Sequence, residues 1–234
     1  MKEGRNSRSI GAWRHCQYCR SNRPRIPCSS SGDDWAVCLS FRPLPALIRG
    51  YSQEETLQPN PLVTDFGAWF SGLLAYEPSA YAEIAEYLKE VMPDLKDIKN
   101  PIIGQGARSI NVNFANISVP FEDLSDGEKC FMISALVLAA NRAYGPLPCF
   151  WDEPDNYLAL SEVGHFVLAL RKAFQSGGQF IATSHNPEAI RRFSAENTLV
   201  LQRRSRSEPT IVRPLEEMKI NGDLVGALIR GDVE

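Results

Sequence analysis

The segment 147–156, LPCFWDEPDN, constrains the fold more than any other part of the chain. Its apolar run ends in two adjacent acids, Asp152 and Glu153, and a proline follows them. That order is typical of a buried strand that delivers carboxylates to the carboxyl edge of a parallel sheet. The segment therefore predicts an α/β fold with polar groups gathered at one edge of its sheet.

Apolar segments of strand and helix type alternate downstream of residue 121. Such alternation indicates βαβ units and a mostly parallel sheet flanked by helices. The pattern predicts helices over residues 127–144, 161–175 and 224–229, a short helix after Asn186, strands over 147–152, 179–184 and 198–202, and an edge strand over 210–214. We take residues 121–234 as one lobe of a larger α/β domain.

Residues 61–120 show a different pattern. Their first half carries apolar residues at helical spacing, which predicts two helices whose aromatic stripe, beginning at Phe66, belongs to the core. Ser79 stands where it can cap the second helix. Residues 100–120 alternate weakly and predict two strands joined near Ala115. This part of the chain is therefore expected to be a helical subdomain with short strands.

Residues 1–60 are rich in Arg, Ser and Pro, and we expect them to form a mostly irregular leader. Residues 1–50 hold nine Lys or Arg and three Asp or Glu, a balance of about +6. A basic arm of this kind keeps a nucleic-acid partner open as an alternative. Cys16 and Cys19 form a CxxC pair, but no second pair follows at the spacing of a zinc site.

The chain shows no apolar run of about 18 residues and no signal-peptide pattern, so we predict no membrane span. Cys130 and Cys149 lie in apolar runs and are expected to be buried thiols. Scattered thiols without a disulfide framework favour a cytoplasmic location.

Two acids at a strand end can do specific chemistry. A carboxylate at the position of Asp152 is the hard oxygen ligand that Mg²⁺ prefers. The next carboxylate, Glu153, can act as a general base on water. An acid pair at a strand–loop junction also occurs without any function, so the pair needs support from other segments.

LSDGEK (124–129) and IATSH (181–185) supply that support. Ser125 and Glu128 have the spacing of a capping box, and a helix N-terminus also suits an anion such as a phosphate. His185 follows an apolar run, where an imidazole can hydrogen-bond a phosphate or a water molecule. Plain helix capping and a structural histidine are the alternatives for these two segments.

The order of these segments is more specific than any one of them. In that order the chain resembles the ABC-type ATPase heads of the RecF, SMC and OLD-like group, often grouped with AAA-family ATPases. LSDGEK is similar to the signature motif, CFWDEP to the Walker B motif, and TSHNPEAI to the switch-histidine region. The resemblance covers roughly residues 121–200, and more loosely the chain from Phe66 onward.

The resemblance implies a P-loop NTPase-like fold, ATP and Mg²⁺ as cofactors, and a role for each matching residue. Asp152 would assist Mg²⁺, Glu153 would be the catalytic base, and His185 would sense the γ-phosphate. Family heads dimerise around two nucleotides, so the signature residues would contact ATP bound to a second copy or a partner head: Ser125, Asp126, Gly127 and Glu128. Residues 155–158 would form the loop that crosses the dimer interface.

The sequence also departs from the family pattern. Asp126 stands where many transporters carry a second glycine, and Ala159 where an interface aspartate often lies. None of the seven lysines follows a glycine, so no phosphate loop of the GxxxxGK type is present. We therefore expect the isolated chain to bind ATP weakly, and the simplest interpretation is a truncated or misjoined gene product that lacks its first lobe.

The leading hypothesis is ATP binding and hydrolysis by the carboxyl-terminal part of an ABC-type ATPase, coupled to DNA maintenance or phage defence. The alternative is a non-catalytic half-site or interaction module that completes the ATP site of a partner head. A third hypothesis assigns nucleic-acid binding to the basic residues 1–50.

Overall fold

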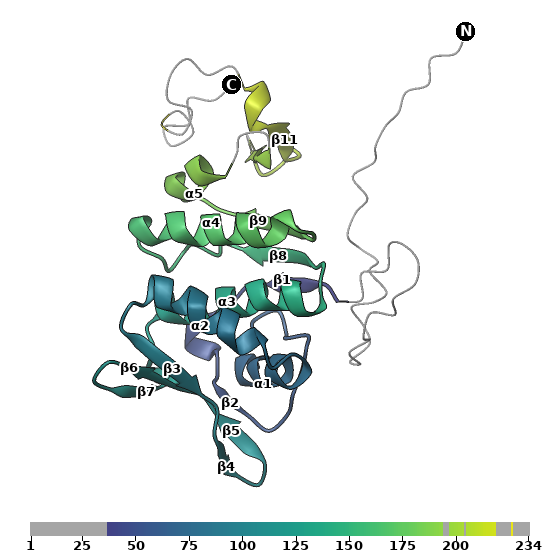
Figure 1. Ribbon diagram of the computed structural model, residues 1–234. Coiled ribbons are helices and arrows are strands. Elements are labelled where there is room, and N and C mark those ends of the chain that lie inside the picture. Colours follow the sequence, from purple (N-terminus) through teal and green to yellow (C-terminus); the bar gives the residue numbers. More distant parts are fainter. Residues whose placement is uncertain (1–36, 194–196, 204, 219–225, 227–234) are drawn as a thin grey trace.

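The computed structural model describes residues 37–193, 197–203, 205–218 and 226 (Figure 1). The CxxC pair and most of the basic leader lie outside the described residues, as does nearly all of the final helix predicted over 224–229. Among the described residues, no helix combines the length and the apolar character that crossing a bilayer requires.

A parallel sheet of three strands occupies the upper half of the molecule (Figure 1). Its order is β1 (Leu39–Phe41), β8 (Pro148–Asp152), β9 (Gln179–Thr183), and both pairings are parallel. Asp152 lies opposite Thr183 in this register. The predicted strands at 147–152 and 179–184 are therefore confirmed, and the fold is mixed α/β with a parallel sheet flanked by helices.

β1 is the main correction to the sequence analysis. It lies within residues 1–60, which were expected to be mostly irregular. A strand of three residues is too short to show an alternating pattern, and its burial depends on pairing with β8. The sheet therefore begins before the helical subdomain rather than after it.

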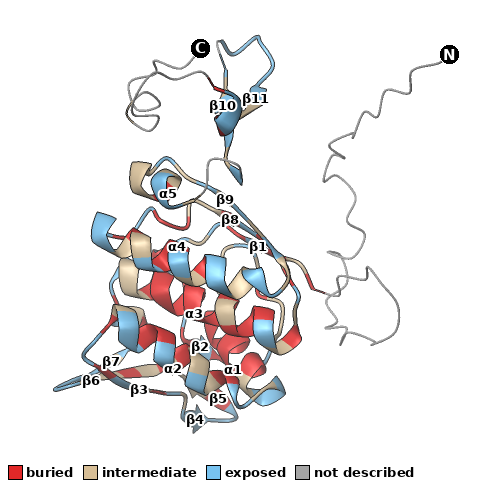
Figure 2. Ribbon diagram, turned by 45° about the horizontal axis from the view of Figure 1, so that its top comes forward, coloured by how far each residue is buried: buried red, intermediate tan, exposed pale blue. Residues whose placement is uncertain are grey.

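The helices lie close to their predicted positions. They are α1 (Phe66–Tyr76), α2 (Ala80–Val91), α3 (Asp126–Tyr144), α4 (Leu160–Gln175) and α5 (Pro187–Arg192). Short 3-10 helices accompany them within the described residues: η3 (Pro45–Leu47), η4 (Phe121–Asp123) and η6 (Leu215–Glu217). α3 is buried along most of its length and runs between the sheet and the helical subdomain, so it shows up as a mostly red helix in Figure 2.

The other strands in the described part of the chain form three small antiparallel sheets. Their members are β2 (Tyr51–Ser52), β5 (Ala107–Ser109) and β4 (Ile102–Gly104); β3 (Leu95–Lys99), β6 (Asn111–Phe114) and β7 (Ser118–Pro120); and β10 (Leu199–Gln202) with β11 (Ile211–Pro214). β6 and β7 are the two strands predicted within residues 100–120, with their turn at Ala115 as expected. The sequence analysis missed β3, β4 and β5 because burial along these strands does not alternate with a period of two residues.

Ser79 occupies the N-cap position of α2 but does not cap it as predicted. Its hydroxyl donates to the carboxylate of Glu77 instead of accepting from a helix N–H. The N-terminus of α5 behaves differently, because the Asn186 side chain accepts a bond of 2.9 Å from the N–H of Glu188.

Aromatic side chains pack together in the core on one face of the parallel sheet. Trp151 of β8 packs edge-on against Phe41 of β1 and against Phe166 of α4, with ring centroids 5.6 and 5.9 Å apart. Cys130 and Cys149 are buried, which confirms their prediction as core thiols. Burial raises the pKa of the Cys130 thiol to about 12.

Candidate functional site

The carboxyl edge of the parallel sheet brings the predicted acids and histidine together. β8 ends at Asp152 and β9 ends at Thr183, and the two residues are partners in the parallel register. Parallel strands end at the same edge, so the residues that follow them, Glu153 and His185, meet there. The structure therefore unites three of the residues that the sequence singled out.

Thr183 joins the two acids. Its hydroxyl donates to Oδ1 of Asp152 at 2.5 Å, and its oxygen accepts the backbone N–H of Glu153 at 3.0 Å. The sequence analysis did not single out this threonine, although it lies inside the IATSH segment. The bonds hold the end of β8 in register with the end of β9.

Glu153 has an unusual backbone conformation. Its φ is +50°, in the left-handed region that residues other than glycine seldom adopt. Holding such a residue there costs on the order of 1 kcal/mol, and such strain gathers at functional sites. The turn redirects the chain directly after the strand, so that the Glu153 side chain lies beside the end of β9.

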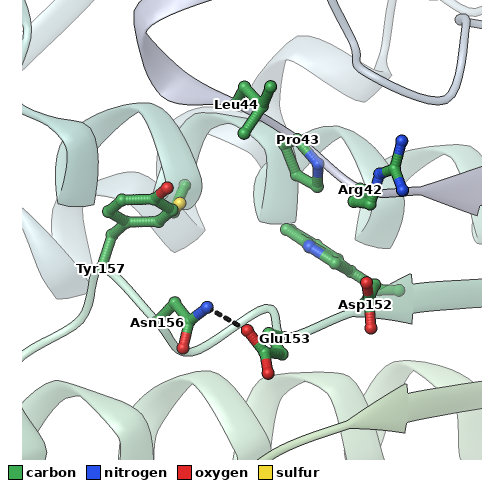
Figure 3. Close-up of a pocket in the computed structure, with 9 residues that line it drawn as sticks. Arg42, Pro43, Leu44, Asp152, Glu153, Asn156 and Tyr157 are labelled. Atoms are coloured by element: carbon green, nitrogen blue, oxygen red, sulfur yellow. Dashed lines mark hydrogen bonds between the residues drawn. The ribbon is translucent and has the colours of Figure 1, made fainter.

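The Glu153 carboxylate has two side-chain partners. Nε2 of His185 lies 3.2 Å from its Oε1. The amide of Asn156 donates to its Oε2, as Figure 3 shows. The His185 side chain is 91% exposed, whereas that of Glu153 is 33% exposed. A half-buried carboxylate paired with a solvent-facing imidazole is an arrangement suited to moving a proton to or from a bound water molecule.

Asp155 ties the loop after β8 to the loop after β9. It is buried, and it accepts a bond of 2.8 Å from the hydroxyl of Ser184. Ser184 in turn accepts the N–H of Asn186 at 3.0 Å. Burial raises the pKa of the Asp155 carboxyl, while the bond from Ser184 opposes that rise. Asp155 was predicted only as part of an interface loop, and the structure shows that it organises the loop.

The LSDGEK segment starts α3 as a capping box. The Ser125 hydroxyl oxygen accepts the N–H of Glu128 at 3.3 Å, and Glu128 Oε2 accepts the N–H of Ser125 at 2.7 Å. The predicted capping is confirmed. Lys129 of the same segment is buried and donates to the Glu122 carbonyl at 2.9 Å, so it serves the core rather than an exposed anion.

Gly127 brings this helix start against the loop that follows β8. A Cβ added at Gly127 would lie 2.9 Å from the carbonyl oxygen of Tyr157. The close approach explains why this position holds a glycine. Ser125 and Asp126 remain exposed, so the first turn of α3 presents polar groups to solvent beside the loop over residues 153–158.

A small cavity lies on the side of the acids that faces β1 (Figure 3). Its volume is about 180 Å³, and its walls include Arg42 and Leu44 after β1, Cys130 of α3, and Glu153 and Tyr157. Ligand pockets usually measure about 300–1,000 Å³, so this cavity does not enclose a nucleotide. The described residues thus form part of a site rather than a closed pocket.

The acids fit a divalent cation that is held mainly by other oxygens. No group of three His, Cys, Asp or Glu side chains able to hold a metal occurs within the described residues. Mg²⁺ typically takes one or two carboxylates and completes its shell with phosphate and water oxygens. Asp152, with one oxygen bonded to Thr183, suits that limited role.

Comparisons with known proteins bear on the fold. No family profile and no curated protein matches the chain. Among solved structures, an Smc head domain with a coiled coil and joint from Pyrococcus yayanosii matches with a TM-score of 0.51 at 15% identity, over 71% of this chain and 31% of that one. An SmcHead bound to the C-winged helix domain of ScpA matches with a TM-score of 0.50 at 16% identity, over 65% of this chain and 46% of that one.

These likenesses establish the fold alone. The chain has the mixed α/β fold of SMC ATPase head domains, which is an ATPase-like nucleotide-binding fold. It spans 31% and 46% of the lengths of the two structures, so the activities of those whole proteins do not transfer to it directly.

Proposed function

We propose that this chain forms the carboxyl-terminal lobe of an ABC-type ATPase head and takes part in ATP binding and hydrolysis. The observation that carries the proposal is the contact between Glu153 and His185 beside Asp152, at the carboxyl edge of a parallel sheet. Ligands of open α/β sheets bind outside that edge. The likeness to ATPase heads supports the same position.

Each side chain then has a role that its contacts permit. The bond from Thr183 fixes Asp152, whose carboxylate would orient Mg²⁺, and the ion supplies charge neutralisation for the phosphates when bound. Glu153 would accept a proton from the attacking water. His185 would hold Glu153 in place through Nε2 and reach the terminal phosphate from its exposed side.

The test is ATP turnover by the full chain, compared with that of Glu153→Gln. Loss of the general base should reduce kcat by about 10²-fold or more, with ATP affinity little changed. Glu86→Gln, on the exposed side of α2, is the matched control and should leave turnover intact. Turnover that survives Glu153→Gln would remove the catalytic assignment.

A second proposal concerns the signature segment, because Ser125 and Asp126 face solvent at the start of α3. Ser125, Asp126, Gly127 and Glu128 would contact ATP held by a second copy or a partner head. In that case the chain acts as a half-site and need not hydrolyse ATP itself. Sedimentation in millimolar ATP tests this: Ser125→Arg should abolish ATP-dependent association, and association that persists would contradict the assignment.

The proposal also covers the cellular compartment and the process that ATP turnover serves. The buried thiols of Cys130 and Cys149 suit a reducing compartment, so we place the activity in the cytoplasm. Coupling of ATP turnover to DNA maintenance or phage defence follows from the group of ATPases that the motifs resemble. Stimulation of turnover by double-stranded DNA would support the DNA role, and turnover that is independent of DNA would count against it.

A further inference from the structure

The imidazole of His185 is placed by its backbone rather than by packing. Its side chain is 91% exposed, so neighbouring side chains do not fix its direction. A surface side chain samples several rotamers, yet Nε2 lies 3.2 Å from the Glu153 carboxylate. The contact therefore requires that the backbone on both sides of His185 is held by other bonds, because the backbone sets where the imidazole begins.

Ser184 closes the backbone around His185. Its hydroxyl oxygen accepts the N–H of Asn186 at 3.0 Å, so the residues before and after the histidine are joined directly. A serine that accepts from the N–H two residues further on forms a tight local turn. The Asn186 side chain then accepts the N–H of Glu188 at 2.9 Å and caps α5. His185 thus lies between a closed turn and a capped helix.

Asp155 fixes the direction of the Ser184 hydroxyl. The hydroxyl donates its single hydrogen to Oδ2 of Asp155 at 2.8 Å. Because that hydrogen points to Asp155, the lone pairs of the oxygen are left to face the N–H of Asn186. Without an acceptor at Asp155 the hydroxyl would be free to rotate, and the turn would lose its closure. Asp155 therefore acts on the backbone of His185 through Ser184.

Two contacts join the turn after β8 to the turn after β9. Glu153 and Asp155 belong to the first turn, where the N–H of Asn156 donates to the Glu153 carbonyl at 3.3 Å. Ser184 and His185 belong to the second. The Glu153–His185 contact involves an exposed imidazole, whereas Asp155 is only 3% exposed. A hydrogen bond is stronger at a buried site than in water, so the buried contact sets the geometry of the exposed one.

The chemical character of Asp155 also indicates a role beyond packing. Burial raises the pKa of its carboxyl, so holding the charged form there costs stability at neutral pH. Ionisable groups perturbed in this way gather at functional sites. The side-chain bond of Asp155 leads to Ser184, the residue next to His185. The geometry and the cost together favour a role in placing the histidine.

We propose that Asp155 and Ser184 form a positioning pair, which holds the His185 imidazole against the Glu153 carboxylate. Both act through His185 and are not themselves catalytic residues. The inference rests on the proposed function, because it concerns the histidine and the base of that same site. The placement of His185 can be measured without ATP, so the two can fail separately.

The test records the imidazole signals of His185 by nuclear magnetic resonance, in the full chain at constant pH and without nucleotide. The chain has three histidines, so the other two serve as internal references. Glu153→Ala defines the signals of an imidazole that has lost its partner. Ser184→Ala and Asp155→Ala should each move the His185 signals to those positions, because the imidazole is then no longer held.

Conservative variants separate the hydrogen bond from the volume of the side chains. Asp155→Asn keeps an acceptor oxygen and Ser184→Thr keeps the hydroxyl, so both should leave the His185 signals at their wild-type positions. Ser71→Ala in α1 is the matched control, because its hydroxyl also donates one hydrogen bond and accepts another. It should leave the His185 signals unchanged. Urea unfolding shows whether each variant keeps its fold, and Ser184→Ala decides if Asp155→Ala does not.

ATP turnover supplies a second readout. Ser184→Ala should lower kcat by about tenfold with KM little changed, because the imidazole is misplaced rather than lost. Ser184→Ala combined with His185→Ala should be no slower than His185→Ala alone, since residues that act as a unit are not additive. Losses that multiply in the double variant would overturn the inference, because Ser184 would then act independently of the histidine.

The magnetic resonance outcomes are equally decisive. His185 signals that stay in place in both alanine variants would overturn the inference. Asp155→Asn moving the signals as far as Asp155→Ala would also overturn it, because the acceptor oxygen would then be irrelevant. If the alanine variants move the signals but the wild-type chain shows no ATP turnover, the positioning pair stands and the proposed function fails.

Discussion

Nε2 of His185 lies 3.2 Å from Oε1 of Glu153, although the two residues follow different strands. The contact depends on the parallel register of β8 and β9, which sets Asp152 opposite Thr183. A whole helix, α4, separates these strands in the sequence. The relationship is thus a product of the βαβ unit, and it gives the candidate site its first testable feature.

Replacing His185 with alanine should lower kcat for ATP by about tenfold to a hundredfold, because Glu153 loses a positioning partner. The side chain is 91% exposed, so the free energy of unfolding should change little. Steady-state kinetics and urea unfolding check the two parts. His165→Ala, on α4, is the control, and equal losses in the two variants would contradict the assignment.

Replacing Thr183 with valine should leave Asp152 and Glu153 less firmly held in the site. The variant removes the donor to Asp152 and the acceptor for the Glu153 N–H. We expect about tenfold weaker Mg²⁺-dependent ATP binding, since one hydrogen bond to a charged group contributes about 1.5–3 kcal/mol. Thr183→Ser retains the hydroxyl and should restore binding. Equal binding by the valine and serine variants would show that the hydroxyl is dispensable.

Gly127→Ala should destabilise the chain by about 1–3 kcal/mol, because the new methyl group would meet the Tyr157 carbonyl at 2.9 Å. Gly164→Ala in α4 is the matched control. Its Cβ would lie 3.4 Å from the flexible side chain of Arg192, and alanine is favoured over glycine within a helix by about 1 kcal/mol. Urea unfolding of both variants should give shifts of opposite sign.

Asp155→Asn should make the chain more stable at pH 7. Burial raises the pKa of Asp155 above its usual 3.8, so the folded state binds the proton more tightly than the unfolded state. Its contribution is most favourable below pH 3.8 and declines as the pH rises through the folded pKa. Asparagine carries no charge and can still accept from Ser184.

Unfolding free energies at pH 4 and pH 7 check this sign. The stability of the wild-type chain should fall relative to Asp155→Asn as the pH rises between these values. Asp94→Asn serves as an exposed control and should track the wild type. A wild-type chain that gains stability over the variant at pH 7 would contradict the role of burial.

The helices that were well predicted share a local cause. α3 begins at Ser125 and Glu128, three residues apart, and α4 carries an apolar stripe with helical spacing. Both signals depend on neighbours along the chain, so they are visible without the tertiary structure. The predicted cap at Ser79 is wrong because another neighbour along the chain, Glu77, accepts the hydrogen bond from its hydroxyl.

The sequence by itself determined the helices α3 and α4, the strands β8 and β9, the acids at the end of β8 and the capping box of α3, because each depends on residues close together in the chain. Only the tertiary structure decided that β1 lies beside β8 and that Thr183 joins the two acids. Strand pairing joins segments that are distant in the sequence, and its register depends on packing of the whole sheet. The left-handed turn at Glu153 is held by those same distant contacts.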